Sequence, residues 1–410
     1  MGHLLVTNDF PPKIGGIQSY LWELWRRLPE GEATVLTTPY RGDAEFDRFA
    51  PMPIVRTRQR WLLPTPVLER QIVRVASERG VDLIVLDPAL PVGWLGPRLR
   101  RHGLRYAVVL HGAEVTVPGR LPGTKQLMRR VLRGADHVIA AGNYPLAEAV
   151  HAAGRSVSST VIAPGIDVDR FRPLGPAERS DVRRRLALPQ DVPLIVSTSR
   201  LVPRKGRDVL IRAAARLHDE FPDLCVAISG SGRNLSRLRK IAAKEQNTDV
   251  RFLGRLSDHD LEGLYGCGDL FVMLCRNRWG GLEQEGFGIV FLEAAASGLA
   301  QIAGRSGGSH EAVVDGVTGL VVERPTDVTA AAEAIAMLLR DPARRGAMAH
   351  AARERAVNEC TYDLMAERLN RTLRGLEITN ASETALTLPK VQVQRRRRDL
   401  ETPKSPDEPI

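Results

Sequence analysis

Short apolar runs alternate along the chain with longer segments in which apolar residues recur at helical spacing. In the first part, the runs predict strands at 4–7, 33–37, 82–86, 106–110, 137–140 and 160–162. Helical patterns, such as that of residues 17–28, lie between most of these runs. Strands that are apolar throughout and separated by helices are typical of a parallel sheet that helices cover on both faces.

The same pattern begins again after Pro164-Gly-Ile-Asp167 and the polar, proline-bearing segment 172–190. The second series predicts strands at 194–198, 224–229, 250–253, 270–274, 299–303 and 319–322. Two such series indicate an α/β protein of two Rossmann-like domains facing a cleft, with ligands at the carboxyl ends of the strands.

This interpretation divides the chain into four parts. We expect an N-terminal domain at 1–170, a C-terminal domain at 171–360, and a helix at 361–377 that crosses back to the first domain. Residues 378–410 are polar, charged and proline-bearing, which predicts a disordered tail.

Composition narrows the class of protein. With 410 residues and 43% hydrophobic content, the chain is long enough for two globular cores. No apolar run reaches membrane-spanning length, and no basic segment followed by an apolar one opens the sequence, so we expect a cytoplasmic protein. The four cysteines show no metal-ligand spacing, which favours buried thiols in a reducing compartment; they are Cys225, Cys267, Cys275 and Cys360.

The segment from Glu285 to Glu293 carries the clearest chemical signal. Its sequence, Glu-Gly-Phe-Gly-Ile-Val-Phe-Leu-Glu, predicts a glycine loop that leads into a helix. The free backbone N–H groups near Ile289 and Val290 would then suit a diphosphate. Charged residues in so apolar a segment are rarely buried without a partner, so we expect the two carboxylates to bind a sugar and a ribose. Two solvated glutamates on a surface helix are the alternative.

The net charge of +10 indicates either that the protein binds an anionic partner or that many of its arginines are solvated. In the segment from Arg56 to Arg70, arginines are mixed with Trp61, Leu62 and Leu63. Basic residues beside interfacial aromatic ones favour peripheral binding to an anionic membrane surface. A loop that leads into a core helix is the alternative.

Several motifs in order resemble a known family. The first group is Gly15-Gly16, His111-Gly-Ala-Glu114 and Pro164 to Phe171; the second is Ser199 to Gly206, Glu285 to Glu293 and Gly307-Gly-Ser-His-Glu311. Together they resemble the retaining glycosyltransferases of family 4, which have the GT-B fold, over about residues 3 to 376. The segments from Val6 to Tyr20 and from Ser199 to Gly206 further resemble the phosphatidylinositol mannoside mannosyltransferases of that family.

The resemblance implies roles for particular residues. Arg200 and Lys205 would stabilise the charge that develops on the leaving diphosphate, which removes the need for a metal. The first-domain glycines would approach the same phosphates, as would the backbone at the start of the second helix; these residues are Gly15, Gly16, Gly288, Ile289 and Val290. His111 and Glu285 would contact hydroxyls of the donor sugar, and Glu293 would hold the ribose. The alternatives are that Arg200 and Lys205 are solvated charges, that Gly15 and Gly16 form a common βα turn, and that His111 has a structural role.

The sequence thus predicts a retaining α-mannosyltransferase that moves mannose from GDP-mannose to a phosphatidylinositol mannoside-type glycolipid. We expect it at the inner face of the cell membrane as a peripheral protein. A UDP-sugar donor, a soluble acceptor and a non-catalytic nucleotide-sugar sensor stay open. A nucleic-acid-binding protein is disfavoured, because only 5% of the residues are aromatic and no nucleic-acid module is recognisable.

Overall fold

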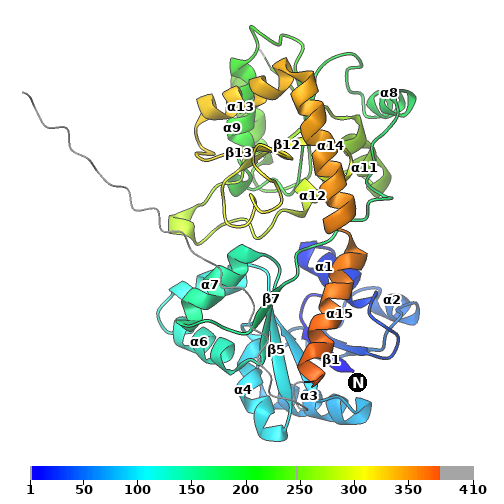
Figure 1. Ribbon diagram of the computed structural model, residues 1–410, viewed down its shortest axis with the longest axis vertical. Coiled ribbons are helices and arrows are strands. Elements are labelled where there is room, and N and C mark those ends of the chain that lie inside the picture. Colours follow the sequence, from blue (N-terminus) through cyan, green and yellow to red (C-terminus); the bar gives the residue numbers. More distant parts are fainter. Residues whose placement is uncertain (1, 246–247, 379–410) are drawn as a thin grey trace, which may run out of the picture. The chain divides into compact units, whose positions relative to one another are not determined.

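The computed structural model describes residues 2–245 and 248–378, whose strands form two parallel sheets (Figure 1). In the first sheet the strand order is β3-β2-β1-β4-β5-β6-β7. The strands are β1 (His3–Thr7), β2 (Ala33–Thr37), β3 (Ile54–Arg56), β4 (Leu83–Asp87), β5 (Arg105–Leu110), β6 (His137–Ala140) and β7 (Ser159–Val161).

The second sheet has the order β10-β9-β8-β11-β12-β13. Its strands are β8 (Leu194–Thr198), β9 (Cys225–Ser229), β10 (Asp249–Gly254), β11 (Leu270–Met273), β12 (Ala300–Gly304) and β13 (Gly319–Val322). Every strand that the sequence predicted is present, with ends shifted by one residue at most. The short β3, whose residues are only half-buried, was not predicted.

Helices follow most strands, as parallel pairing requires. In the first half they are α1 (Gly16–Trp25), α2 (Asp43–Arg48), α3 (Pro66–Arg79), α4 (Gly96–Leu99), α5 (Ala113–Arg120), α6 (Thr124–Gly134) and α7 (Asn143–Ala153). In the second half they are α8 (Pro176–Arg185), α9 (Arg207–Arg216), α10 (Leu235–Lys244), α11 (Asp258–Cys267), α12 (Ile289–Ala296), α13 (Val328–Arg340) and α14 (Pro342–Glu359).

Side chains alternate between the two faces of each sheet. On β1, Leu4 and Val6 join one core cluster and Leu5 joins another. On β8, Val196 and Ile195 likewise belong to different clusters. Each sheet is therefore covered by apolar cores on both faces, which confirms the predicted α/β architecture of two Rossmann-like units.

The last helix, α15 (Tyr362–Ile378), packs against the first sheet (Figure 1). Its buried residues Met365, Leu369 and Leu373 belong to the same core cluster as Leu5 of β1. The predicted helix that crosses back is thus confirmed. The predicted boundaries of the two domains stay a prediction, and the predicted tail from 378 lies outside the described residues except for Ile378.

The strand order reverses direction at one place in each sheet. In the first sheet this place is between β1 and β4, and in the second it is between β8 and β11. At such switch points the connections leave in opposite directions, so the carboxyl ends of the strands open into a crevice. This geometry is what positions the candidate site.

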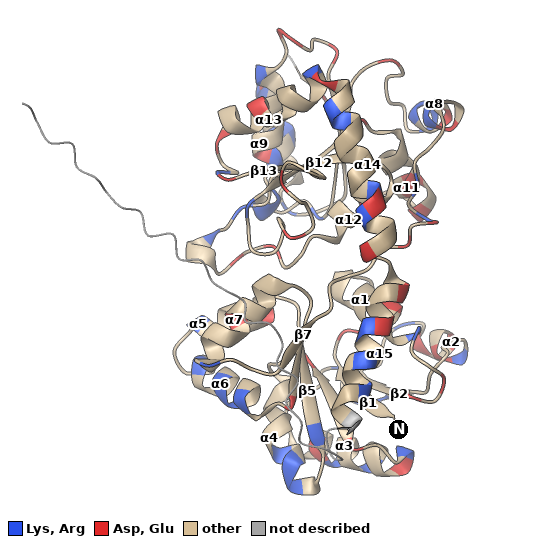
Figure 2. Cartoon of the chain, in the orientation of Figure 1, with Lys and Arg blue, Asp and Glu red and all other residues tan. Residues whose placement is uncertain are grey.

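Much of the positive charge lies on ordinary helix faces. Blue and red residues are interspersed along α8, α14 and α15 in Figure 2. Arg172, in the segment before α8, pairs with Glu178 of that helix at 2.6 Å. Part of the arginine excess therefore consists of solvent-exposed side chains that are paired with carboxylates. The four cysteines are free and buried, as predicted.

Candidate functional site

A pocket of about 360 Å³ is lined by residues from the carboxyl ends of strands in both sheets. We call it the inter-sheet pocket. Its lining from the first half comprises Gly16, Ile17, Tyr20, His111, Ala141 and Pro164; from the second half it comprises Ser199, Arg200, Arg204, Lys205, Glu285, Phe287, Gly288, Ile289 and Val290. Eight of the ten residues predicted for the site lie in this lining; the exceptions are Gly15 and Glu293.

Glu285 is the electrostatic centre of the pocket. Its side chain is buried, and its Oε2 lies 2.7 Å from Lys205 Nζ and 3.3 Å from Arg204 Nε. Burial by itself would raise the pKa of Glu285, but the two cations outweigh it and bring the pKa below the ordinary value. The carboxylate is therefore ionised at neutral pH and can only accept hydrogen bonds.

A tight turn brings the two cations to Glu285. Residues Pro203–Lys205 form one 3₁₀ turn, and Gly206 follows with a φ of 67°. A Cβ at Gly206 would lie 1.9 Å from the carbonyl oxygen of Leu274, so only glycine lets this turn approach the segment after β11. The glycine thus lets the turn that carries Lys205 pack against the segment that leads to the glutamate loop.

His111 comes directly after β5. Its Nε2 lies 2.8 Å from Oδ1 of Asp87, the last residue of β4, and Asp87 also accepts a 2.6 Å hydrogen bond from Thr7. Burial alone would lower the pKa of His111, but the Asp87 carboxylate reverses this and raises it above the ordinary value. The pair favours a positively charged imidazole that donates hydrogen bonds.

The two halves approach each other closely beside His111. A Cβ at Gly286 would lie 2.6 Å from the carbonyl oxygen of His111. On the other side of the contact, Glu311 accepts hydrogen bonds from the backbone N–H groups of Asn143 (2.7 Å) and Tyr144 (2.6 Å) at the start of α7. The halves therefore meet at the edge of the pocket, where Gly286 allows a close backbone contact and the Glu311 carboxylate caps the start of α7.

Helix α12 begins at the pocket. Gly288 precedes it with a φ of 92°, and Ile289 and Val290 form its first turn. The N–H groups of a first turn have no partner within the helix, so they are free to bind an anion. Gly16 faces this turn from α1, since a Cβ there would lie 3.8 Å from Cδ1 of Ile289.

Two predicted residues lie outside the pocket lining. Gly15 precedes α1 as its N-cap. Glu293 is half-buried one turn further along α12, where it accepts a hydrogen bond from the hydroxyl of Tyr265, and burial raises its pKa. Its predicted ribose contact stays a prediction.

Sequence reasoning missed four residues that the structure brings to this region. Arg204 pairs with Glu285, Asp87 holds His111, and Tyr20 lines the pocket while donating to the carbonyl of Ile162. Arg207 is buried beneath them, and its guanidinium nitrogens have no hydrogen-bond partner among the described residues. Asp87 was detectable, because it ends an apolar strand just as His111 follows one.

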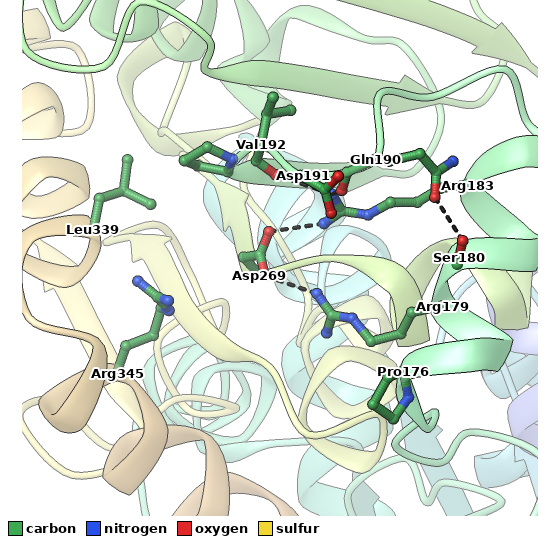
Figure 3. Close-up of a pocket in the computed structure, with 11 residues that line it drawn as sticks. Pro176, Arg179, Ser180, Arg183, Gln190, Asp191, Val192, Asp269, Leu339 and Arg345 are labelled. Carbon is green, nitrogen blue, oxygen red and sulfur yellow. Dashed lines mark hydrogen bonds and ion pairs between the residues drawn. The ribbon is translucent and has the colours of Figure 1, made fainter.

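A second hollow, of about 600 Å³, has a different character (Figure 3). It lies beside Asp269, which precedes β11, and thus at the amino-terminal edge of the second sheet. There Arg179 and Arg183 pair with Asp269 at 2.7 and 2.9 Å. Arg183 also donates to the carbonyl of Cys267, so these charges serve to hold α8 on the sheet.

Metal-binding residues are not gathered anywhere in the described part of the chain: no group of three or more His, Cys, Asp or Glu side chains there could hold an ion. Likewise, no helix within the described residues is long and apolar enough to cross a membrane.

Comparison with known proteins bears on the whole chain. Residues 14–170 match the model of the Glycosyltransferase Family 4 domain, and residues 178–355 match Glycosyl transferases group 1. The chain is 39% identical to the GDP-mannose-dependent alpha-(1-6)-phosphatidylinositol monomannoside mannosyltransferase of Mycolicibacterium smegmatis, covering 91% of this chain and 98% of the relative. It is 32% identical to D-inositol 3-phosphate glycosyltransferase of Salinispora tropica, covering 84% and 78%.

Solved structures agree on the fold. HepE of Anabaena in complex with UDP has a TM-score of 0.77 at 21% identity, covering 92% of this chain and all of that one. Sucrose-phosphate synthase of Thermosynechococcus elongatus has a TM-score of 0.72 at 22% identity, with the same coverage. The two sheets, the inter-sheet pocket and the full-length relatives lead to one conclusion: the chain is a glycosyltransferase that belongs to family 4.

Proposed function

We propose that the protein is a retaining α-mannosyltransferase that transfers mannose from GDP-mannose to a phosphatidylinositol mannoside-type glycolipid. The observation that carries the proposal is the buried Glu285, held ionised by Lys205 and Arg204 in a pocket that faces His111. The names of full-length relatives at 37–39% identity support the choice of donor and acceptor.

The cations of the pocket suit the leaving diphosphate. When the bond between C1 of mannose and the β-phosphate oxygen breaks, its electron pair stays on that oxygen. Arg200 and Lys205 would stabilise this charge, with the first turn of α12 and the two glycines at the start of α1 supplying backbone N–H groups. Since fixed cations already provide the positive charge, we propose that no metal is needed.

The acidic and imidazole groups suit the sugar. Glu285 would accept hydrogen bonds from hydroxyls of the mannose and orient them, and His111, whose pKa Asp87 raises, would form a further hydrogen bond to the sugar. The acceptor hydroxyl would attack C1 from the face that the diphosphate leaves, and its proton would pass to the departing phosphate oxygen. Glu293 would accept hydrogen bonds from the ribose hydroxyls.

An exposed patch on the first half suits a lipid-bound acceptor. Between β3 and α3, the side chains of Trp61 and Leu63 are 70% and 53% exposed, and Val67 in the first turn of α3 is 54% exposed. Arg58 and Arg60 of the connecting segment and Arg70 of α3 are also exposed. Asn8, which follows β1, holds this segment through 2.7 and 3.3 Å hydrogen bonds to the backbone of Leu62. We propose that the patch docks on the anionic inner face of the membrane.

One predicted member of that patch has another role. Arg56 is half-buried and pairs with Asp47 at 2.7 Å, while it also donates to the carbonyls of Thr38 and Pro11. The membrane-facing charge is therefore assigned to the exposed arginines only.

A soluble acceptor is the second candidate. The similarity to D-inositol 3-phosphate glycosyltransferase favours it, because that name describes a small phosphorylated acceptor. Both candidates share the pocket and the family, and they differ in the acceptor and in the need for a membrane surface.

Nucleotide binding tests the donor. Calorimetry of GDP, UDP, ADP and their mannose or glucose conjugates, without added metal, is expected to give selective binding of GDP and GDP-mannose. A preference for UDP would discard the mannosyltransferase proposal and leave the family unchanged.

The substitution Glu285→Gln is expected to lower kcat/KM by about 100-fold, because the neutral amide no longer fixes the sugar or balances Lys205. The matched control is Glu178→Gln, an exposed carboxylate paired with Arg172. Steady-state kinetics with a thermal unfolding curve for each variant checks the result. Near wild-type kinetics in the folded Glu285→Gln protein would remove the residue from the site.

The His111–Asp87 pair makes a pH-dependent prediction. NMR titration of labelled histidines should show His111 titrating above 6.5, its ordinary value, and Asp87→Asn should lower that pKa. Because the pKa of His111 is raised in the folded state, the His111–Asp87 pair contributes fully to folding stability below about pH 6.5. That contribution is lost as the pH rises through the folded-state pKa of His111. His137, whose pKa burial lowers to about 4, gives the contrast within one spectrum. Titration of His111 at or below 6.5 would contradict the assignment.

Flotation with liposomes tests the patch. The double variant Trp61→Ala/Leu63→Ala is expected to lose most binding to vesicles that contain phosphatidylinositol, and salt should weaken binding of the wild type. Phe49→Ala, which removes another exposed aromatic ring, serves as the control. Equal binding to neutral and anionic vesicles at all salt concentrations would rule out this docking surface.

A further inference from the structure

A separate polar pocket, of about 610 Å³, opens next to the inter-sheet pocket. One wall comes from α5 and α7 of the first half, and the other from the segment between β11 and α12. We call it the Trp279 pocket. Its principal side chains are Arg120, Tyr144, Glu148, Asn277, Trp279 and Gln284.

Trp279 gives this pocket an aromatic platform. The indole is 64% exposed, although tryptophan is usually buried. The guanidinium of Arg278 lies 4.7 Å from the ring centroid and is itself held by Glu283 at 2.7 Å. One face of the indole is thereby covered, and the exposed remainder offers a flat apolar surface to a ligand.

The backbone at Trp279 adopts an unfavourable conformation. Trp279 has a φ of 50°, and among the described non-glycine residues only Ala187 shares a positive φ. Such a conformation is strained in a large residue, and strained residues tend to cluster at ligand sites. Two glycines with positive φ, Gly280 and Gly281, complete the turn.

The polar groups around the platform are already fixed in place. Arg120 and Glu148 form a two-pronged ion pair at 3.0 and 2.5 Å, and the Tyr144 hydroxyl lies 2.6 Å from Thr116. Asn277 accepts a 2.7 Å hydrogen bond from Ser306 through its Oδ1, which directs its amide protons elsewhere. A flat apolar face flanked by fixed donors and acceptors matches the two sides of a sugar ring.

The position relates the pocket to the acceptor. Gln284 lines the Trp279 pocket and Glu285, the next residue, lines the inter-sheet pocket. Gly112 marks the boundary, because a Cβ there would lie 3.3 Å from Gly286 and 3.5 Å from the ring of Tyr144. The two pockets therefore adjoin, which would let a molecule that reacts beside His111 extend an adjoining ring toward the Trp279 pocket.

We infer that the Trp279 pocket binds a hexose ring of the acceptor, namely the mannose that a monomannosylated lipid already carries. This inference rests on the proposed function. The pocket would then distinguish phosphatidylinositol monomannoside from phosphatidylinositol, which lacks that ring.

Kinetics of the full chain test the inference. Trp279→Ala is expected to lower kcat/KM for phosphatidylinositol monomannoside in micelles by about tenfold or more, mainly through KM. Hydrolysis of GDP-mannose and the affinity for GDP should stay within about twofold, whereas Trp279→Tyr should retain most of the activity because it keeps an aromatic face. Phe49→Ala is the matched control for the loss of an exposed ring.

A binding measurement separates this inference from the proposed function. Saturation-transfer NMR with methyl α-mannoside should show contact with the wild type in the presence of GDP, and none with Trp279→Ala. If the wild type transfers no mannose to any lipid, the proposed function fails while this measurement still reports on the pocket. Unchanged acceptor kinetics, weakened GDP binding in Trp279→Ala, or methyl α-mannoside contact that survives the substitution would each overturn the inference.

Discussion

The buried ion pair between Glu285 and Lys205 constrains the whole second half of the site. An ionised carboxylate that is 8% exposed pays a large desolvation cost, and only close, well-placed cations offset it. The turn after β8 must therefore meet the loop before α12, and Gly206 allows that approach. The first turn of α12 is then held where its N–H groups face the pocket.

Parallel strands explain why the first half contributes to the same place. Their carboxyl ends share one edge of a sheet, and the crevice forms where the strand order reverses. His111 and Asp87 stand at that edge in the first sheet, as Arg200 and Lys205 do in the second. The two sites of charge differ in kind: Lys205 and Arg204 lower the pKa of the Glu285 carboxyl, whereas the Asp87 carboxylate raises the pKa of the His111 imidazole.

Local pattern predicted the sheets, and eight of the ten residues that it proposed for the site line one pocket. The strands are continuous apolar runs, so the sequence indicated both where they lie and that they belong to parallel sheets covered on both faces. β3 was missed because its three residues are half-buried and run into an arginine-rich segment that looks like surface. Arg56 was assigned to that surface because its partner, Asp47, lies on another element and no spacing links the two. Arg204 escaped notice because the sequence shows neighbouring cations without showing which one the turn directs at Glu285.

Helix α15 has a consequence for how the protein is made. It supplies Met365, Leu369 and Leu373 to the core that covers one face of the first sheet, yet it is the last described element of the chain. On the ribosome, the N-terminal strands emerge long before this helix does. Until it arrives, apolar residues such as Leu5 and Val35 lack part of their cover. Nascent chains that stop before α15 should therefore need chaperones, although they already contain every residue that lines the inter-sheet pocket.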